Sequence, residues 1–153
     1  MSKTLGERLA RLLGRKPPDM QVAALCLDGK GKILLVTSRG TGRWIVPKGW
    51  PMPGRTLADA AMQEAWEEAG VRGRVNQSSL GSYHYDKQQD HGFAIPVEVR
   101  VFALEVDELA DDYPEKDDRK RRWYRPDRAA ELVTESELKK LLRALPARLG
   151  HQA

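Results

Sequence analysis

The sequence predicts an α+β fold in which a mixed β-sheet is flanked by helices on both faces. Three observations lead to this prediction: β-favouring runs intermix with helical segments, no internal repeat is present, and no linker separates a second domain. At 153 residues the chain suits one domain with a sizeable core. We expect an N-terminal helix and connector at residues 1–18, a single domain at 19–147, and a C-terminal tail at 148–153.

The first part of the sheet is predicted from short apolar runs. Residues 21–27 and 33–37 are apolar, and the Gly- and Lys-rich residues between them favour a turn, so this pair is typical of a hairpin. Residues 44–46 form a further short strand, which a proline stops. The glycines and prolines of residues 48–55 indicate a loop.

The segment after this loop has the strongest helical pattern, over residues 56–69. Thr56 and Asp59 have the spacing of a capping box, and Gly70 is a natural stop. Two long β-rich segments follow, 71–85 and 93–106.

The rest of the chain is assigned from composition and periodicity. We expect a polar loop at 86–92 between the two long β segments and an acidic loop at 107–118. A final strand at 121–125 precedes two helices, 126–132 and 135–145. The second helix carries a leucine stripe that would face the core.

Composition and charge narrow the functional classes. With 41% hydrophobic and 31% charged residues, the chain should be globular rather than disordered. The net charge of +4 does not require nucleic acid as a partner, but it suits a polyanionic ligand if the basic residues cluster. No apolar run reaches the roughly 20 residues that span a bilayer. The amphipathic residues 1–15 favour a docking helix over a membrane anchor. Cys26, the single cysteine, favours a core role and a cytoplasmic location.

Three glutamates stand out on the helix at 56–69. At roughly 100° per residue, Glu64, Glu67 and Glu68 fall within about 100° of arc, while most of the helix surface is apolar. Carboxylates held this close on a packed helix repel one another and lose hydration, and a divalent cation offsets both costs. The alternative is that they are ordinary exposed glutamates. The Gly-rich loop that leads into the helix favours a magnesium and phosphate site.

These glutamates belong to a longer pattern. The residues at fixed spacing are Gly49, Glu64, Glu67, Glu68, Gly70 and Val71. The pattern resembles the Nudix box, Gly-x5-Glu-x7-Arg-Glu-U-x-Glu-Glu-x-Gly-U, where U is a bulky aliphatic residue; the smaller Ala65 takes one of the U positions. A match at this spacing is far more specific than a lone Gly-x-Gly. The resemblance implies a Nudix-like α/β/α sandwich.

Two further segments extend the resemblance over roughly residues 20–145. Residues 43–49, Arg-Trp-Ile-Val-Pro-Lys-Gly, are similar to the entry into the box in diphosphoinositol polyphosphate phosphohydrolases and diadenosine polyphosphate hydrolases. Residues 122–124, Arg-Trp-Tyr, are similar to the closing strand of that branch. The resemblance implies a hydrolase that cleaves a phosphoanhydride bond. Magnesium, with manganese as a possible substitute, would be held by Glu64, Glu67, Glu68 and a backbone carbonyl at Gly49. One of the glutamates would act as base.

Two positions of the box depart from the family. Arg55 stands where the family has its first Glu, and Gln63 stands where it has Arg. These residues usually pair to brace the loop against the helix. We expect Arg55 to pair with another carboxylate or to face substrate.

Basic residues in the segment before the helix are candidate substrate ligands: Arg39, Arg43, Lys48 and Arg55. Lys87 and the run at 119–122 could extend this positive surface. His84 and His91 flank the 86–92 loop and could contact substrate, although an exposed-loop role is preferred. For Trp44 a core position is favoured over a base-stacking platform.

The favoured hypothesis is a pyrophosphohydrolase acting on a highly phosphorylated small molecule, such as a diadenosine polyphosphate or a diphosphoinositol polyphosphate. RNA 5′-end pyrophosphohydrolysis shares this chemistry. A further alternative is a catalytically weak nucleotide- or RNA-binding protein, with the basic run at 119–122 beside Trp123 and Tyr124 as a backbone-contact stripe. Nucleic acid is therefore possible but not favoured, and no membrane partner is expected. The oligomeric state stays open.

Overall fold

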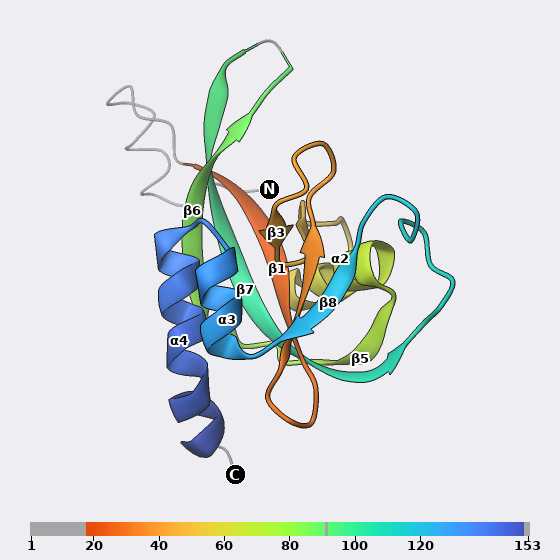
Figure 1. Ribbon diagram of the computed structural model, residues 1–153. Helices are drawn as coiled ribbons and strands as arrows, with labels where there is room; N and C mark the ends of the chain where they lie inside the picture. Colours follow the sequence, from red (N-terminus) through yellow and green to blue (C-terminus); the bar gives the residue numbers. More distant parts are fainter. Residues whose placement is uncertain (1–17, 91, 152–153) are drawn as a thin grey trace.

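The structure is a computed structural model that describes residues 18–90 and 92–151, with side chains described up to residue 146. Figure 1 shows one sheet between helices. The elements in chain order are β1 (Asp19–Leu27), β2 (Ile33–Thr37), β3 (Trp44–Ile45), β4 (Lys48–Gly49), α2 (Leu57–Ala69), β5 (Val71–Val75), β6 (Gly81–Gln88), β7 (Ala94–Leu109), β8 (Arg121–Tyr124), α3 (Pro126–Leu132) and α4 (Ser136–His151).

The sheet is mixed, as expected, and is organised around β1. This strand runs parallel to β7, in register from Asp19 opposite Val97 to Leu27 opposite Glu105. Its other edge pairs antiparallel with β4 and, at one end, with β2. The far edge of β7 pairs antiparallel with β6 and then β5, and β2 pairs antiparallel with β3 and β8.

Helices cover both faces of the sheet, with α2 on one side and the α3–α4 pair on the other (Figure 1). Alternate residues of β1 contribute to the two sides because successive side chains of a strand point in opposite directions. Val22, Ala24 and Cys26 belong to the α2 side. Ala23, Leu25 and Leu27 belong to the α3–α4 side. The strand is buried on both faces, which explains its continuous apolar sequence.

Helix α2 begins and ends where the sequence predicts. The Thr56 side chain accepts a hydrogen bond from the Asp59 backbone N–H at 3.1 Å. The Asp59 carboxylate accepts from Gln77 at 2.9 Å, so only half of the expected capping box forms. Gly70 ends the helix at φ 68°, a left-handed conformation that costs glycine little.

Helix α4 carries the leucine stripe on the opposite side. Leu138, Leu142 and Leu145 are buried, and Leu141 packs against the same cluster. The helix runs to His151, past the end expected at residue 145.

Several expected boundaries are wrong. Residues 48–49 are a short strand paired with β1, rather than the start of a loop. The expected β segment 71–85 is divided into β5 and β6. β6 continues to Gln88, which shortens the expected loop at 86–92, and β7 continues to Leu109. β6 extends past its apolar part because it pairs with β7, and β7 because its end pairs with β5; both pairings satisfy backbone groups.

The helix expected at residues 1–15 lies outside the described residues. Over the described part of the chain, every helix is too short or too polar to cross a bilayer.

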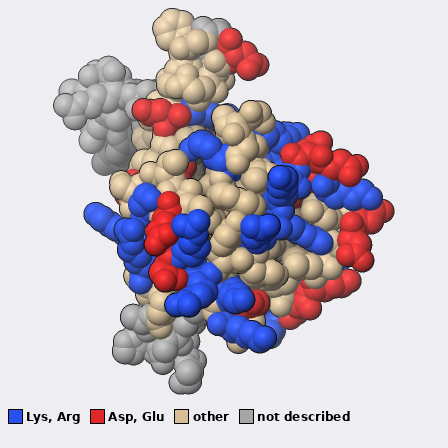
Figure 2. Space-filling model, viewed as in Figure 1, with Lys and Arg blue, Asp and Glu red and all other residues tan. Residues whose placement is uncertain are grey.

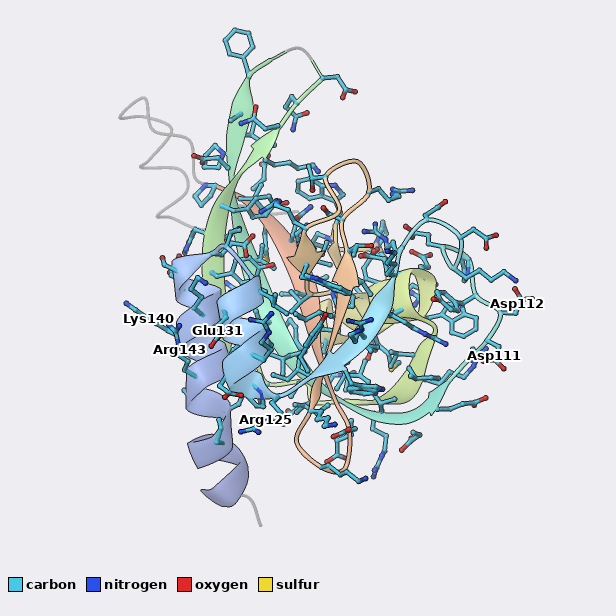
Figure 3. The ribbon with its side chains drawn as sticks, in the orientation of Figure 1. Asp111, Asp112, Arg125, Glu131, Lys140 and Arg143 are labelled. Carbon is cyan, nitrogen blue, oxygen red and sulfur yellow. The ribbon has the colours of Figure 1, made fainter. Side chains whose placement is uncertain are left out.

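Charge is distributed unevenly over the surface. On the face shown in Figure 2, Lys and Arg gather over the middle, and Asp and Glu gather along the right-hand edge. Asp111 and Asp112, in the segment after β7, lie at that edge (Figure 3). Lys140 and Arg143 project from α4 on the other side of the view. The small net charge therefore hides a separation into basic and acidic regions.

Candidate active site

A cavity of about 610 Å³ lies where α2, β4 and the segment before β8 meet. Gly49, Glu64 and Glu68 line it, which brings together three of the four predicted metal-site residues. Because β4 pairs with β1, Gly49 lies opposite Val22 at the centre of the sheet. The helix therefore presents these carboxylates to a strand that is paired within the sheet.

Glu68 is the most buried charged side chain of the site, with 2% of its surface exposed. The Lys48 backbone N–H donates to both of its carboxylate oxygens, at 3.2 and 3.4 Å. Burial raises the pKa of Glu68 to about 8; the Arg119 guanidinium acts in the opposite direction, and the charge of Glu64 adds to the rise. Ionisation of this carboxyl therefore costs free energy. A bound cation would offset that cost, because it favours the charged form.

The Glu64 carboxylate packs directly on the backbone of Gly49. A Cβ added to Gly49 would lie 2.5 Å from each oxygen of Glu64. Glycine is therefore required here for close approach rather than for backbone conformation. Burial raises the pKa of Glu64, and the charge of Glu67 raises it further.

Glu67 lies at the margin of this arrangement. Its carboxylate accepts a hydrogen bond from the Gln63 amide at 3.2 Å, and its backbone carbonyl accepts one from the Glu115 N–H at 2.9 Å. The cavity is lined by Glu64 and Glu68, the two glutamates one turn apart, and Glu67 stands to one side of them.

Arg55 does not pair with a carboxylate, and that expectation is wrong. Its guanidinium donates to the Gln63 side-chain oxygen at 3.1 Å, and Gln63 in turn donates to Glu67. The two departures from the box thus compensate each other, since an amide can accept from Arg55 and donate to Glu67 at once. A contact between loop and helix is therefore kept, and Arg55 is not among the residues that line the cavity.

Four cationic side chains line the cavity: Arg39, Lys48, Lys87 and Arg119. Burial lowers the pKa of Lys48. Lys87 lies on β6. The sequence indicates it as a residue that could extend the positive surface. Arg43, by contrast, donates to Thr134 at 2.8 Å and lies 3.9 Å from Glu135 at the α3–α4 connection.

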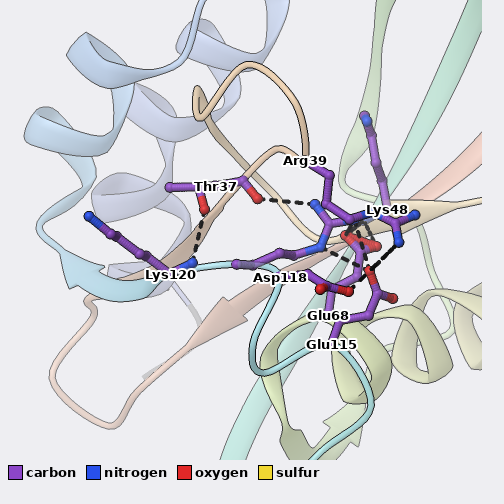
Figure 4. A network of polar contacts seen from close by, with 8 residues as sticks. Thr37, Arg39, Lys48, Glu68, Glu115, Asp118 and Lys120 are labelled. Carbon is purple, nitrogen blue, oxygen red and sulfur yellow. Dashed lines mark hydrogen bonds and ion pairs between the residues drawn. The ribbon is translucent and has the colours of Figure 1, made fainter.

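Arg119 connects the acidic segment to the site through contacts with Thr37, Glu68 and Glu115. Figure 4 shows these three partners close together. The Arg119 side chain is 9% exposed and lies 3.1 Å from Glu115 and 3.7 Å from Glu68. It also donates to the Thr37 carbonyl at 3.0 Å. Arg39 lies 3.6 Å from Glu115. Glu115 is therefore a further carboxylate that lines the cavity. It comes from the segment 107–118, for which the sequence predicted only an acidic loop.

The side chains of the basic run at 119–122 have different surroundings. Arg119 points into the site, and Arg121 donates to the Ala69 carbonyl at 2.7 Å, where it caps the end of α2. Lys120 and Arg122 face solvent. The run therefore does not form one continuous stripe.

The structure also bears on the expectations for Trp44 and His84. Trp44 packs edge-on against Tyr124, with ring centroids 5.3 Å apart, and contributes to the core as favoured. His84 faces Glu137 of α4 at 3.0 Å, so it contacts that helix instead of the cavity. His91 lies outside the described residues.

Sequence reasoning missed several residues of the cavity wall. Trp50 and Met52 line it beside Gly49, and Gln21 lines it from β1. A signal existed for Gln21, which is 3% exposed and is the polar residue that opens an apolar run. No signal separated Glu115 from the other acidic residues of its segment.

The residues present suit a divalent cation. Glu64 and Glu68 lie close together, are desolvated and have raised pKa values, and a cation would stabilise their charged forms. Within residues 18–90 and 92–151, no three acidic, histidine or cysteine side chains form a ready-made cage. Such a site fits magnesium, which is often held by one or two carboxylates together with substrate phosphates.

Comparison with known proteins agrees with this geometry. The NUDIX domain model matches residues 17–145. Nudix hydrolase 13, mitochondrial, of Arabidopsis thaliana is 32% identical over 139 residues, which cover 85% of this chain and 69% of that protein. Diphosphoinositol polyphosphate phosphohydrolase 3-alpha of Mus musculus is 33% identical over 118 residues, 74% of this chain and 68% of that protein.

Solved structures show the same fold. A NUDIX hydrolase from Nitrosomonas europaea superposes with a TM-score of 0.67 at 20% identity, covering 86% of this chain and 90% of that one. An Ap4A hydrolase from C. elegans superposes with a TM-score of 0.61 at 21% identity, covering 87% of this chain and 99% of that one. The chain therefore belongs to the Nudix family of hydrolases, which act on phosphoanhydride bonds.

Proposed function

We propose that this protein is a metal-dependent pyrophosphohydrolase that cleaves a phosphoanhydride bond in a highly phosphorylated small molecule. The observation that carries the proposal is one cavity in which desolvated carboxylates, Glu64 and Glu68, face four cationic side chains. Polyphosphate chains carry dense negative charge, so cations on the wall can hold them. A diadenosine polyphosphate and a diphosphoinositol polyphosphate both meet this description.

The cofactor we propose is magnesium, with manganese as a substitute. Glu64, Glu67, Glu68 and the Gly49 carbonyl would hold it. When bound, it supplies Lewis-acid stabilisation of negative charge on the phosphates.

The chain's own residues position the phosphates and the attacking water. Lys48, Lys87 and Arg39 offer donors from three different strands and loops, which fixes a phosphate chain along the cavity. A site glutamate that remains ionised can accept a proton from the attacking water. Holding both reactants in this geometry supplies much of the rate acceleration in phosphoryl transfer.

The relatives motivate both substrate types. The mouse relative is described as a diphosphoinositol polyphosphate phosphohydrolase, and the C. elegans structure as an Ap4A hydrolase. Triphosphorylated RNA is a further candidate, because its 5′ end presents the same linkage.

A catalytically weak binding protein is less well supported. That alternative rested on a lost brace and a basic stripe, whereas Arg55 and Gln63 remain paired and the run at 119–122 is divided. For the compartment we propose the cytoplasm, since the thiol of Cys26 is buried and unpaired; the Arabidopsis relative is described as mitochondrial.

A substrate panel tests the proposed function. Purified protein is incubated with diadenosine tetraphosphate, a diphosphoinositol polyphosphate and triphosphorylated RNA, in magnesium or manganese, and the products are followed by phosphorus NMR. Glu64→Gln and Glu68→Gln should each lower turnover by about 100-fold or more, as for loss of a group that stabilises charge in the reaction. Glu67→Gln, at the margin of the cavity, should have the smallest effect of the three.

Glu108→Gln is the matched control, because Glu108 is an exposed glutamate on β7 outside the cavity. Unchanged turnover in both the Glu64→Gln and the Glu68→Gln variants would refute the proposed metal role. Hydrolysis of none of the three substrates would refute the proposed function.

A further inference from the structure

Trp50 is an exposed tryptophan at the edge of the cavity. It follows Gly49 directly, lines the cavity, and has 43% of its surface exposed. Across the described ranges, Trp50 and Phe93 are the large hydrophobic residues with this degree of exposure. Phe93 belongs to the turn between β6 and β7, outside the cavity lining. Ligand sites are commonly lined by aromatic side chains, so an exposed tryptophan in the cavity lining can contact a ligand.

Apolar residues near Trp50 contribute to the lining of the cavity. Pro51, Met52 and Ile45 line the cavity with it; Ile45 belongs to the core cluster beneath α2, and Met52 packs against that cluster. We refer to Ile45, Trp50, Pro51 and Met52 as the apolar lip. Because two of its members pack into the core, the lip is held in place by the fold.

The remainder of the wall has the opposite character. Glu64, Glu68 and the four cationic side chains supply charge. The lining thus offers charged side chains that suit phosphates and apolar side chains that suit a flat, apolar group. Its volume of about 610 Å³ lies within the range for small-molecule sites, roughly 300–1,000 Å³.

This division distinguishes the two substrate classes. A nucleoside polyphosphate has a charged end and a planar base, and bases stack on aromatic side chains. A diphosphoinositol polyphosphate carries phosphates around its whole ring, so each side of it needs cations. The apolar lip offers no cation, and burying phosphate against it would be unfavourable.

We propose that Trp50 is a specificity-determining residue that stacks on the base of a nucleoside polyphosphate, whose phosphates lie along Arg39, Lys48, Lys87 and Arg119. This inference rests on the proposed function and narrows its substrate to one that carries a nucleobase. The shared chemistry, a base joined to a polyphosphate, occurs in dinucleoside polyphosphates and at the 5′ end of triphosphorylated RNA.

Steady-state kinetics test the inference. Wild type, Trp50→Ala, Trp50→Phe and the control Phe93→Ala are compared on diadenosine tetraphosphate, triphosphorylated RNA and a diphosphoinositol polyphosphate. Trp50→Ala should raise KM for the base-containing substrate about tenfold more than for the inositol substrate, as expected for a lost stacking contact. Trp50→Phe should restore most of the difference, because phenylalanine keeps an aromatic face. The wild-type kcat/KM values on the first two substrates decide between the two sources of the base.

A binding measurement separates this inference from the proposed function. Calorimetry on the full chain compares adenosine 5′-(β,γ-methylene)triphosphate with inorganic tripolyphosphate, which carries similar charge without a base. Wild type should bind the nucleotide about tenfold more tightly, and Trp50→Ala should remove the preference. A protein that hydrolyses nothing but shows this preference would refute the proposed function and support the stacking role.

Three results would overturn the inference. One is an equal loss on base-containing and inositol substrates in Trp50→Ala, which would indicate a structural role. Another is a preference of the wild type for the inositol substrate. The third is equal affinity for the nucleotide and tripolyphosphate.

Discussion

The two faces of the sheet are built from different residues and carry different roles. On the α3–α4 side the helices contribute large side chains, Leu138, Leu142 and Leu145. On the α2 side the helix contributes almost only alanines. These are Ala58, Ala60, Ala61, Ala65 and Ala69, all of them buried. Both faces are apolar, and the nearly buried Glu68 lies at the edge of the α2 face.

The difference shows how the fold positions charge. Small side chains at a helix contact bring the helix backbone closer to its partner. With alanines beneath it, α2 lies close enough for Glu64 to rest on the backbone of Gly49 and for Glu68 to accept from Lys48 N–H. The leucine face contributes stability, whereas the alanine face sets the geometry of the site.

Substitution on the leucine face should lower the free energy of unfolding without changing the activity of the folded protein. Leu142→Ala should lower the free energy of unfolding by about 2–5 kcal/mol, because it leaves a cavity in a fully buried cluster. Urea denaturation measures the loss, and the rate per folded molecule should stay within about twofold of wild type. A large fall in that rate would show that the two faces are not independent.

Substitution at Gly49 should lower turnover without lowering the stability of the fold. Gly49→Ala places a methyl group against the Glu64 carboxylate, which is the free end of a side chain and can move aside. We expect turnover to fall by about 100-fold, as for a misplaced reactive group, with little change in the urea midpoint. Gly29→Ala is a suitable control, because a Cβ there meets open space. Turnover close to wild type would contradict the required close approach.

The brace between loop and helix should have a smaller effect. Arg55→Met removes the hydrogen bond to Gln63, which is exposed, so the cost in unfolding free energy should be about 1 kcal/mol or less. Thermal denaturation compares it with Arg125→Met, an exposed arginine near Asp127. A destabilisation of several kcal/mol would mean that Arg55 has a stronger partner than Gln63.

The least perturbing test uses Cys26, which belongs to the α2 face. Burial raises the pKa of its thiol to about 12 from 9, so the native group stays protonated until well above neutral pH. The contribution of the protonated thiol to folding stability is fully present below pH 9. It is lost as the pH rises toward 12, because the thiol of the unfolded chain ionises first. Iodoacetamide at pH 8.5 should therefore label Cys26 only when the protein unfolds. Rapid labelling of native protein would show that this face is open to water.

Much of the fold could be predicted from the sequence. The apolar runs of β1 and β2 and the capped helix α2 follow from local patterns, since hydrophobic period and capping chemistry act over a few residues. The parallel pairing of β1 with β7 and the strand at Lys48–Gly49 could not be predicted this way. Both depend on partners distant in sequence.

The site was predictable only in part. Spacing indicated the glutamates and Gly49, because the box is contiguous. The contacts of Arg55 with Gln63 and of Arg43 with Thr134 were not predicted, because hydrogen-bond partners depend on the tertiary fold. Lys87, Glu115 and Arg119 reach the cavity from other segments, and Trp50 gave no periodic signal. Tertiary contacts select these residues, and local patterns do not carry that information.

The central claim is that Glu64 and Glu68 hold a divalent cation in the cavity beneath α2. Electron paramagnetic resonance of a manganese titration tests it directly, because free Mn²⁺ gives a sharp signal that disappears on binding. Wild type should remove one or more equivalents of the signal, and magnesium should restore it by competition. Glu64→Gln and Glu68→Gln should each weaken binding by at least about tenfold, while Glu108→Gln should not. Equal manganese affinity in all four proteins would contradict the account.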